Sequence, residues 1–252
     1  MKRFILAATI ALMCFGTNAF SKELPEALAR CGVHFGIGTT GYWDYPPQFL
    51  VGSDDWGGVA VDLGGVFKLN INETVNFLLE LNLGLNATER EISQKSTRHG
   101  VYSQVESRTI YKLSMPLLLR IKPLDFLFVD AGVQFNGNFA SSSGKEYKDE
   151  KGNSIASPKA NLEDWKVKGE TTSLVFGLSL GSHVGELGAR FVLDMDRIHK
   201  NDKIVFYDDG DEIYLYDDYV KRSSGSKSAK PYVAENKTKI WSLQFVINYY
   251  IK

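Results

Sequence analysis

The stretch Val75–Glu89, VNFLLELNLGLNATE, alternates apolar and polar side chains with a period of two. Its odd positions are Val, Phe or Leu as far as Leu85, and its even positions include Asn76, Glu80 and Asn86. Successive side chains of a β-strand point to opposite faces, so the stretch predicts a strand with one apolar and one polar face. Such a strand would pack poorly in a water-soluble core. We expect its apolar face to meet lipid and its polar face to line a barrel.

The same alternation recurs in seven further segments of the chain. Several of them exceed the roughly 9 to 11 residues that a tilted strand needs to cross a bilayer, whereas strands of soluble domains are nearer 5 or 6. With Val75–Glu89, they predict an all-β fold, an eight-stranded antiparallel up-and-down transmembrane β-barrel. The segments are Cys31–Thr39, Gly57–Ile71, Tyr111–Ile121, Phe126–Phe139, Thr172–Val184, Leu187–Met195 and Trp241–Ile251.

Short and long connections alternate strictly between these segments. Transmembrane barrels have short turns on the periplasmic side and long loops outside the cell, and a soluble lipocalin-like barrel need not separate them in this way. The pattern therefore favours a membrane barrel. The short connections are Asn72–Thr74, Lys122–Asp125 and the neighbourhood of Gly185, and the long ones are Gly41–Trp56, Arg90–Ser107, Ala140–Glu170 and Ile198–Lys237.

Charged residues occupy the polar face of the predicted strands. An eight-stranded barrel is just wide enough for side chains to fill its interior, so we expect these charges to neutralise one another and to leave no open pore. His34 and His183 are also expected to face inward, on strands that are not neighbours, as filling rather than as a catalytic pair. The charged residues are Asp62, Lys68, Glu80, Lys112, Arg120, Asp130, Arg190 and Asp194.

The N-terminal residues have the pattern of a secretory signal peptide. Two basic residues precede the apolar stretch Phe4–Phe15, and small residues follow as far as Ala19. Cleavage is expected after Ala19, with Ser21 as the second choice. We therefore divide the chain into a signal peptide over residues 1–21 and an outer-membrane barrel domain over residues 22–252.

Cysteine content and charge exclude several classes of protein. Lipidation at Cys14 is disfavoured because Met13 stands where that processing site needs a small side chain. After cleavage Cys31 is the one remaining cysteine, so no intramolecular disulfide can form. Loss of two basic residues from the 29 present leaves 27 against 30 acidic ones, a net charge of −3, and no basic stripe that would bind nucleic acid remains. The mean hydropathy of −0.17 is compatible with a barrel, whose strands alternate.

The segment Ile110–Pro123, IYKLSMPLLLRIKP, resembles the most recognisable strand of the PorT-like outer-membrane β-barrel family, which has the form YLxIPLLLKY. Met115 stands where the family usually has isoleucine. The sequences DAGVQF at Asp130–Phe135, SLVFGLSLGSHV and GARFVLDM are similar to later strands of that family. The resemblance implies an outer-membrane location and no defined catalytic role. One departure is the C-terminus, which ends in Ile251-Lys252 rather than in the aromatic residue common in such barrels.

The long loops contain two candidate binding features. The acidic run Asp208–Glu212 offers oxygen ligands for Ca²⁺, but it lacks EF-hand spacing, and we favour a hairpin turn between Ile204–Tyr207 and Ile213–Tyr216. Loop aromatic residues could form a platform for a glycan or protein partner, or lie in the aromatic girdle at the membrane interface. These residues are Tyr42, Trp43, Tyr45, Tyr207, Tyr214, Tyr216 and Tyr219.

The sequence therefore predicts an outer-membrane barrel with a structural, adhesive or surface-binding role. We assign no catalytic, cofactor-binding or metal-binding residue, because no group of residues requires a particular reaction. Expected partners are outer-membrane lipid and lipopolysaccharide, the barrel assembly machinery, and an extracellular glycan or protein met by the loops, with the chain acting as a monomer. The alternatives are a barrel enzyme acting on lipid or peptide and a soluble lipocalin-like periplasmic binder.

Overall fold

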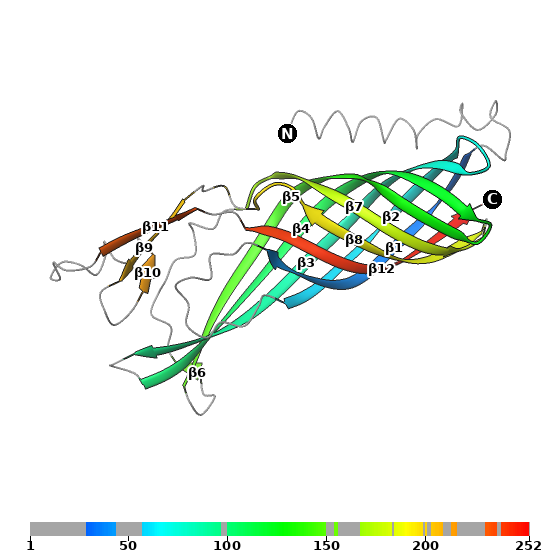
Figure 1. Cartoon of the computed structure of the whole chain (residues 1–252). Helices are drawn as coiled ribbons and strands as arrows, with labels where there is room; N and C mark the ends of the chain where they lie inside the picture. The colour runs from blue at the N-terminus through cyan, green and yellow to red at the C-terminus, as the bar shows by residue number, and fades with distance from the viewer. Residues whose placement is uncertain are drawn as a thin grey trace.

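Eight strands close into a single antiparallel barrel (Figure 1). The structure, a computed structural model, describes residues 29–43, 57–96, 100–149, 154–155, 167–182, 184–198, 200, 203–208, 213–215, 230–235 and 238–251. The wall strands are β1 (Ala29–Trp43), β2 (Gly57–Asn70), β3 (Val75–Ser96), β4 (Gly100–Leu124), β5 (Leu127–Asp149), β7 (Glu170–Gly181), β8 (Gly185–Asp194) and β12 (Lys239–Ile251).

Each wall strand pairs with the next one along the chain, and the last pairs with the first. Phe35 of β1 shows the closure, since it lies opposite Leu63 of β2 on one side and Ile247 of β12 on the other. All of these pairings are antiparallel. The predicted eight-stranded up-and-down barrel is therefore confirmed.

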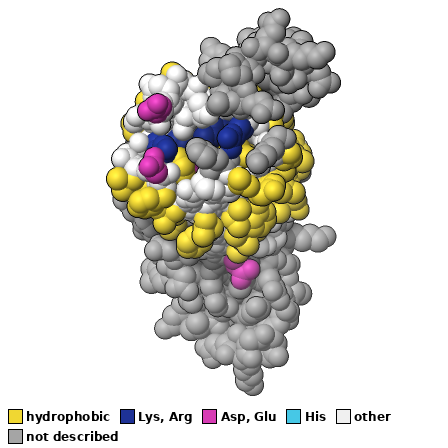
Figure 2. All heavy atoms as spheres, turned by 90° about the vertical axis from the view of Figure 1, so that its right-hand side faces the viewer, with side chains coloured by type: hydrophobic (Ala, Val, Ile, Leu, Met, Phe, Trp, Pro, Cys, Tyr) yellow, Lys and Arg dark blue, Asp and Glu magenta, His cyan; other side chains and the backbone are white. Residues whose placement is uncertain are grey.

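The outer wall is apolar, as the alternation predicts. Leu63, Leu83 and Phe245 expose 61%, 61% and 66% of their surface. Figure 2 looks onto the short-turn end, where hydrophobic side chains surround the barrel and charged side chains lie within that ring. Large apolar side chains facing outward all around a closed wall require a lipid environment. Among the described residues, no helix is long and apolar enough to cross a membrane.

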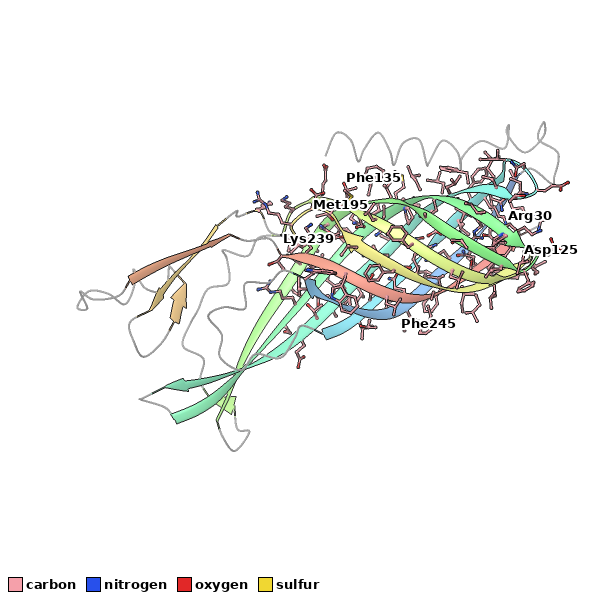
Figure 3. All side chains as sticks on the ribbon, viewed as in Figure 1. Arg30, Asp125, Phe135, Met195, Lys239 and Phe245 are labelled. Atoms are coloured by element: carbon pink, nitrogen blue, oxygen red, sulfur yellow. The ribbon has the colours of Figure 1, made fainter. Side chains whose placement is uncertain are left out.

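The short connections gather at one end of the barrel, together with Ala29 and the C-terminal strand end (Figure 1). At the turn after β2, the side-chain oxygen of Asn72 accepts hydrogen bonds from the backbone N–H groups of Thr74 (2.9 Å) and Val75 (2.7 Å). This arrangement satisfies backbone donors locally and fixes a tight turn. Arg30 of β1 and the turn residue Asp125 lie at this end in Figure 3, and Lys239 and Met195 lie at the other.

Three wall strands continue well beyond the barrel. β3 and β4 stay paired as far as Ser96 opposite Gly100, and β4 stays paired with β5 as far as Tyr102 opposite Asp149. The short strand β6 (Ser154–Ile155) adds to β5 there. Much of the predicted loop Arg90–Ser107 is thus a projecting β-ribbon. Hydropathy could not show this, because both faces of a strand above the membrane meet water and need not alternate.

A separate three-stranded sheet forms within the connection between β8 and β12. It consists of β9 (Lys203–Asp208), β10 (Ile213–Leu215) and β11 (Lys230–Glu235), in the order β10-β9-β11. The predicted hairpin is present, with Tyr207 opposite Tyr214. The third strand, β11, was not predicted.

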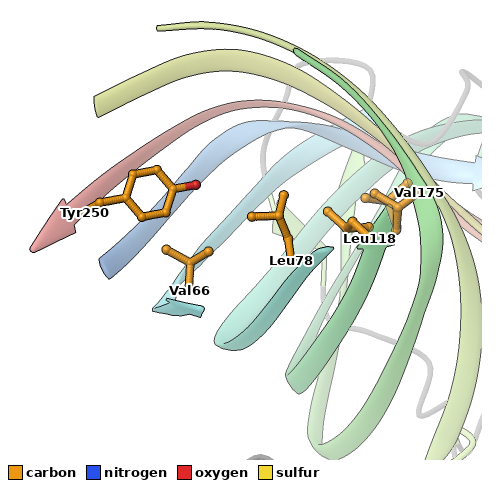
Figure 4. Close-up of a cluster of buried hydrophobic side chains, with 6 residues drawn as sticks. Val66, Leu78, Leu118, Val175 and Tyr250 are labelled. Carbon is orange, nitrogen blue, oxygen red and sulfur yellow. The ribbon is translucent and has the colours of Figure 1, made fainter. Parts of the chain in front are cut away.

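The lumen also holds a buried apolar cluster, which corrects the expectation of a mostly wet inner face. Its members come from six strands and point inward near the short-turn end and the middle of the barrel (Figure 4). They sit on the inner parity of each strand, so the predicted register is right and only the predicted polarity is wrong at these positions. The members are Val66, Leu78, Leu118, Val175, Val192 and Tyr250.

Candidate functional site

Arg120 on β4 is the centre of a buried charge network near the short-turn end. Its Nε and Nη2 atoms donate to the two carboxylate oxygens of Asp130 at 2.6 and 2.8 Å. Its Nη1 atom donates to Glu186 on β8, and Ser179 lies 3.4 Å from Nη2. Arg120 has no exposed surface. A bidentate contact of this kind fixes both partners as well as neutralising them.

Glu186 connects this network to two further strands. It accepts a hydrogen bond from Lys68 of β2 at 3.2 Å and one from the hydroxyl of Tyr250 of β12 at 3.0 Å. The Lys68 ammonium also lies 5.1 Å from the ring centre of Phe128, and the Arg120 guanidinium lies 4.9 Å from it. One carboxylate therefore joins β2, β4 and β12 to β8 through the lumen.

A second layer is built on Glu80 and Arg190. Two nitrogens of Arg190 donate to the two oxygens of Glu80 at 2.7 Å each, and Asn82 donates to Glu80 at 3.0 Å. Glu80 is fully buried and Arg190 exposes 2% of its surface. A carboxylate and a guanidinium at this depth are stable only as a pair.

His34 belongs to the same layer. Its Nε2 atom lies 2.8 Å from a carboxylate oxygen of Asp62, and its Nδ1 atom lies 2.7 Å from the side-chain oxygen of Asn248. Gln244 donates to the other Asp62 oxygen at 2.7 Å. The histidine is fully buried, so it fills the lumen as predicted. His183 lies outside the described residues.

A third layer lies towards the long-loop end. The hydroxyl of Ser173 donates to Asp194 at 2.5 Å. Lys112 lies close to Asp62 because Gly84 has no side chain. A Cβ at Gly84 would stand 3.3 Å from Cε of Lys112 and 3.2 Å from Cβ of Asp62. A larger residue at position 84 would push these two charged groups apart.

An apolar cap closes the long-loop mouth of the lumen. Ile110, Ile198 and Ile240 are buried at 2%, 1% and 6% exposure, and Tyr42 and Val167 pack against them. Backbone hydrogen bonds hold the cap in place, since the N–H of Ile198 donates to Thr238 (2.9 Å) and the N–H of Lys168 donates to Ile198 (2.7 Å). We call Ile110, Ile198, Ile240, Tyr42 and Val167 the mouth cap.

All eight charged residues predicted to face inward are buried in the lumen. Glu186 and Arg108 are buried as well and were not predicted. Glu186 lies in the predicted turn around Gly185, and Arg108 lies between the predicted loop Arg90–Ser107 and the predicted strand that begins at Tyr111. With these two added, the buried charged residues of the described chain are five acidic and five basic, so the plug is balanced. The period-two register could have placed both, had the strands been extended by a few residues.

The loop predictions are only partly described by the structure. The guanidinium of Arg108 lies over the ring of Tyr42, 5.8 Å from the centre of that ring. Trp43 exposes 53% of its surface at the outer rim. Tyr207 and Tyr214 are cross-strand neighbours. Tyr45, Tyr216, Tyr219 and residues 209–212 of the acidic run lie outside the described residues, as do His99 and His199.

In the described interior, buried acidic and basic side chains neutralise one another. The side chains around the His34 ring in the described barrel are the Asn248 amide and the Asp62 and Glu80 carboxylates, and no hydroxyl or thiol of the described residues is hydrogen-bonded to it. Among the described residues no group of three or more His, Cys, Asp or Glu is arranged to hold a metal ion. The hydroxyl of Ser173 donates to Asp194 rather than to His34, so no Ser–His pair forms within the described residues.

A closed antiparallel barrel with an apolar outer wall and a charged, filled interior defines the class of outer-membrane β-barrel proteins. The protein is located in the outer membrane, with the short turns on the periplasmic side and the long loops outside the cell. No protein-family model matches the sequence, and no curated protein matches it.

Solved structures with a similar fold include proteins of Yersinia pestis, Escherichia coli and Neisseria meningitidis. Ail, the attachment invasion locus protein of Yersinia pestis, in complex with the heparin analogue sucrose octasulfate, has 10% identity and a TM-score of 0.34, covering 89% of this chain and 99% of its own. The outer membrane protease OmpT from Escherichia coli has 9% identity and a TM-score of 0.37, covering 92% and 100%. The translocator domain of the autotransporter NalP from Neisseria meningitidis has 12% identity and a TM-score of 0.28, covering 98% and 97%. Values of this size carry no information about activity.

Proposed function

We propose that this protein is a closed, non-conducting outer-membrane scaffold that holds its extracellular loops for a structural, adhesive or surface-binding role and catalyses no reaction. The observation that carries the proposal is the lumen, in which charge pairs such as Arg190 with Glu80 span the interior below the mouth cap. A filled interior gives a rigid base for loops and leaves no path for solutes.

The loops supply the second half of the proposal. The ribbon of β3, β4 and β5 and the sheet of β9, β10 and β11 both lie at the long-loop end (Figure 1). Opposite Tyr207 stands Tyr214 on one side and Pro231 on the other. Tyrosine is enriched in binding hot spots, so tyrosines at paired positions of this sheet favour a binding role for it. The proposed partner is therefore an extracellular glycan or protein.

Membership of the PorT-like family is also a proposal, supported by the strand Ile110–Pro123. The residues of this strand alternate as any outer-membrane barrel strand requires, with Leu113 and Leu119 on the outer wall and Lys112 and Arg120 in the lumen. Residues 1–21 lie outside the described part of the chain, so the signal peptide stays a prediction. Recognition by the barrel assembly machinery and a monomeric state also remain proposals.

The two alternatives lack a supporting observation in the described residues. A lipocalin-like binder directs an apolar face inward around a ligand, whereas here Leu63 and Phe245 are among many large apolar residues that face outward. A barrel hydrolase needs a nucleophile beside a base, and His34 has Asp62 and Asn248 as its hydrogen-bond partners. The scaffold role fits the described residues better than either.

Conductance in a planar lipid bilayer tests the closed interior. The purified barrel should produce no stepwise current at 100 mV or so, a potential worth about 2.3 kcal/mol per elementary charge. A porin inserted under the same conditions is the positive control. Regular openings of uniform size would contradict a filled, non-conducting lumen.

Binding by the loops is tested on cells that carry the protein. The segment between Lys200 and Thr238 is replaced by a short Gly-Ser linker, and attachment of the cells to glycan-coated and protein-coated surfaces is compared with that of the full chain. We expect attachment to fall to the level of cells without the protein, while the folded barrel remains in the membrane. Unchanged attachment, for this variant and for one lacking the ribbon beyond Glu89, would exclude a surface-binding role.

A further inference from the structure

Three cationic residues stand in a row on neighbouring strand ends at the extracellular rim. Lys168 directly precedes Gly169 and β7, Arg197 follows β8, and Lys239 begins β12. The backbone bonds from Lys168 to Ile198 (2.7 Å) and from Ile198 to Thr238 (2.9 Å) show that the three segments are adjacent. Neighbouring strands lie about 4.8 Å apart, so the three residues are within the reach of one anionic group or of two adjacent ones. We call Lys168, Arg197 and Lys239 the basic rim row.

The basic rim row faces outward, away from the lumen. Lys239 begins β12 and precedes the buried Ile240, so strand alternation turns it to the outer surface. Ile198, in the segment after β8, is buried at 1% exposure in the mouth cap, and Arg197 beside it is partly exposed. Val167 packs into the mouth cap, and Lys168 beside it is partly exposed. All three members of the row are partly exposed.

Apolar residues lie directly beside and below the row. Trp43 of β1 is opposite Lys239 in the β1–β12 ladder and exposes 53% of its surface. Met195, two residues before Arg197 in the segment that follows β8, exposes 53% of its surface. Figure 3 shows Met195 and Lys239 close to each other at this end of the barrel. The row thus stands where the apolar wall ends, which is the depth of the lipid headgroups.

The charge of this neighbourhood is clearly positive. Lys200 is exposed close by and adds a fourth cation. Two acidic residues oppose these four: Glu170 is exposed, and Asp196, which is partly exposed, accepts a hydrogen bond from the backbone N–H of Thr172 at 2.9 Å. Glu170 and Arg197 each have an interaction within the protein, so Lys168 and Lys239 are the two cations on which the site chiefly depends. At the opposite end of the barrel, by contrast, Lys122 is neutralised by Asp125 at 2.9 Å.

We propose that the basic rim row binds the phosphate groups of a phosphorylated lipid of the outer leaflet, such as lipopolysaccharide, with the acyl chains lying on the wall below it. Ammonium and guanidinium groups donate charge-assisted hydrogen bonds to phosphate oxygens, and Trp43 and Met195 contact the first acyl segments. The site would hold one lipid over β7, β8 and β12 and would fix the depth of the barrel. The inference rests on the orientation used in the proposed function and does not depend on what the loops bind.

The test compares two double variants of the full chain in detergent. Lys168→Gln with Lys239→Gln removes two cations of the row, and Arg30→Gln with Lys122→Gln removes two cations at the periplasmic end. Affinity for lipid A carrying two phosphates is measured by titration at low salt, alongside the same lipid without phosphates and inorganic phosphate alone. We expect the rim variant to bind diphosphorylated lipid A about thirtyfold more weakly, because each cation near a charged headgroup is worth roughly a factor of five to ten. The periplasmic variant should bind as the unchanged protein does.

Several results would overturn this proposal. Equal affinity for lipid with and without phosphates would show that the basic rim row does not bind the phosphate groups. Equal losses of affinity in the two double variants would show an unspecific effect of net charge. Binding of inorganic phosphate as tight as that of the lipid would assign the row to a free anion instead. Lys239→Arg should retain binding, and thermal unfolding of each variant without lipid checks that the barrel is intact. The lipid affinities do not depend on what the loops bind, so a negative result in the cell-attachment experiment would not change them.

Discussion

Arg190 on β8 and Glu80 on β3 meet across the full width of the lumen through two hydrogen bonds of 2.7 Å. Three strands separate β8 from β3 by either route around the wall, so the pair joins opposite sides of the barrel. Arg120 and Glu186 make a second cross-lumen link one layer lower. These contacts brace the barrel from inside, in addition to the buried apolar cluster and the mouth cap.

Removing one partner of the Glu80–Arg190 pair should lower the unfolding free energy much more than replacing both partners together. Arg190→Met leaves a buried carboxylate without its partner, and we expect a loss of about 3–5 kcal/mol in unfolding free energy. The double variant Glu80→Met with Arg190→Met should recover most of that loss. Urea unfolding of the barrel in detergent, followed by tryptophan fluorescence, measures both. Equal losses in the single and double variants would mean that packing volume matters more than charge pairing.

Arginine on the outer wall should destabilise the barrel according to depth. Leu63 and Leu83 face each other near mid-height of the wall, each with 61% of its surface exposed. Leu63→Arg should lower the unfolding free energy by about 2–4 kcal/mol, and Val59→Arg near the extracellular rim by about 0–1 kcal/mol. The measurement is reversible unfolding in lipid vesicles. Similar values at the two depths would argue against a lipid-facing wall.

Two glycines near the same rim should respond differently to a side chain. A Cβ at Gly38 would stand 1.9 Å from the carbonyl oxygen of Leu243, whereas a Cβ at Gly57 would meet nothing within 4 Å. Gly38→Val should therefore disturb the β1–β12 ladder and cost about 1–3 kcal/mol or more, while Gly57→Val should be close to neutral. The folded fraction is measured by the mobility shift of unheated samples on a gel. Equal tolerance would show that the strands can separate to admit the side chain.

Ile198 should control the opening of the extracellular mouth. Ile198→Ala removes apolar contacts from the mouth cap at a cost of about 2–4 kcal/mol. Amide hydrogen exchange should speed up at Lys168 and Ile198, whose N–H groups make the bonds across this region. Ile247→Ala on the lipid-facing side, where the residue is 49% exposed, is the control and should leave both amides unchanged. Faster exchange over the whole barrel would indicate a global effect instead.

The register of the wall could be predicted from the sequence because lipid and lumen impose opposite demands on alternate residues. Asp62, Arg120 and Arg190 all lie on the predicted inner face. The same rule fails at Leu78 and Val175, which are buried in the lumen although they are apolar. Inside a narrow barrel, side chains must fill space as well as solvate one another, and position along the axis decides which is needed.

The partners of the buried charges could not be predicted. Lys68 pairs with Glu186, which is 118 positions away along the chain, and Arg190 pairs with Glu80, which is 110 positions away. Such contacts depend on the closed circumference and on how far each strand is shifted along its neighbours. Alternation fixes the face of a residue but not its height in the barrel, so only the structure could match the pairs.

The ribbon formed by β3, β4 and β5 extends well beyond the barrel on the extracellular side. From Glu89, the last β3 residue paired with β2, to Ser96 the strand adds 7 residues, or about 24 Å at 3.4 Å per residue. A headgroup layer is only about 5–7 Å deep on each side of a bilayer. A molecule approaching the cell would therefore touch hydrogen-bonded backbone before it touches lipid, and the height of first contact is set by strand length.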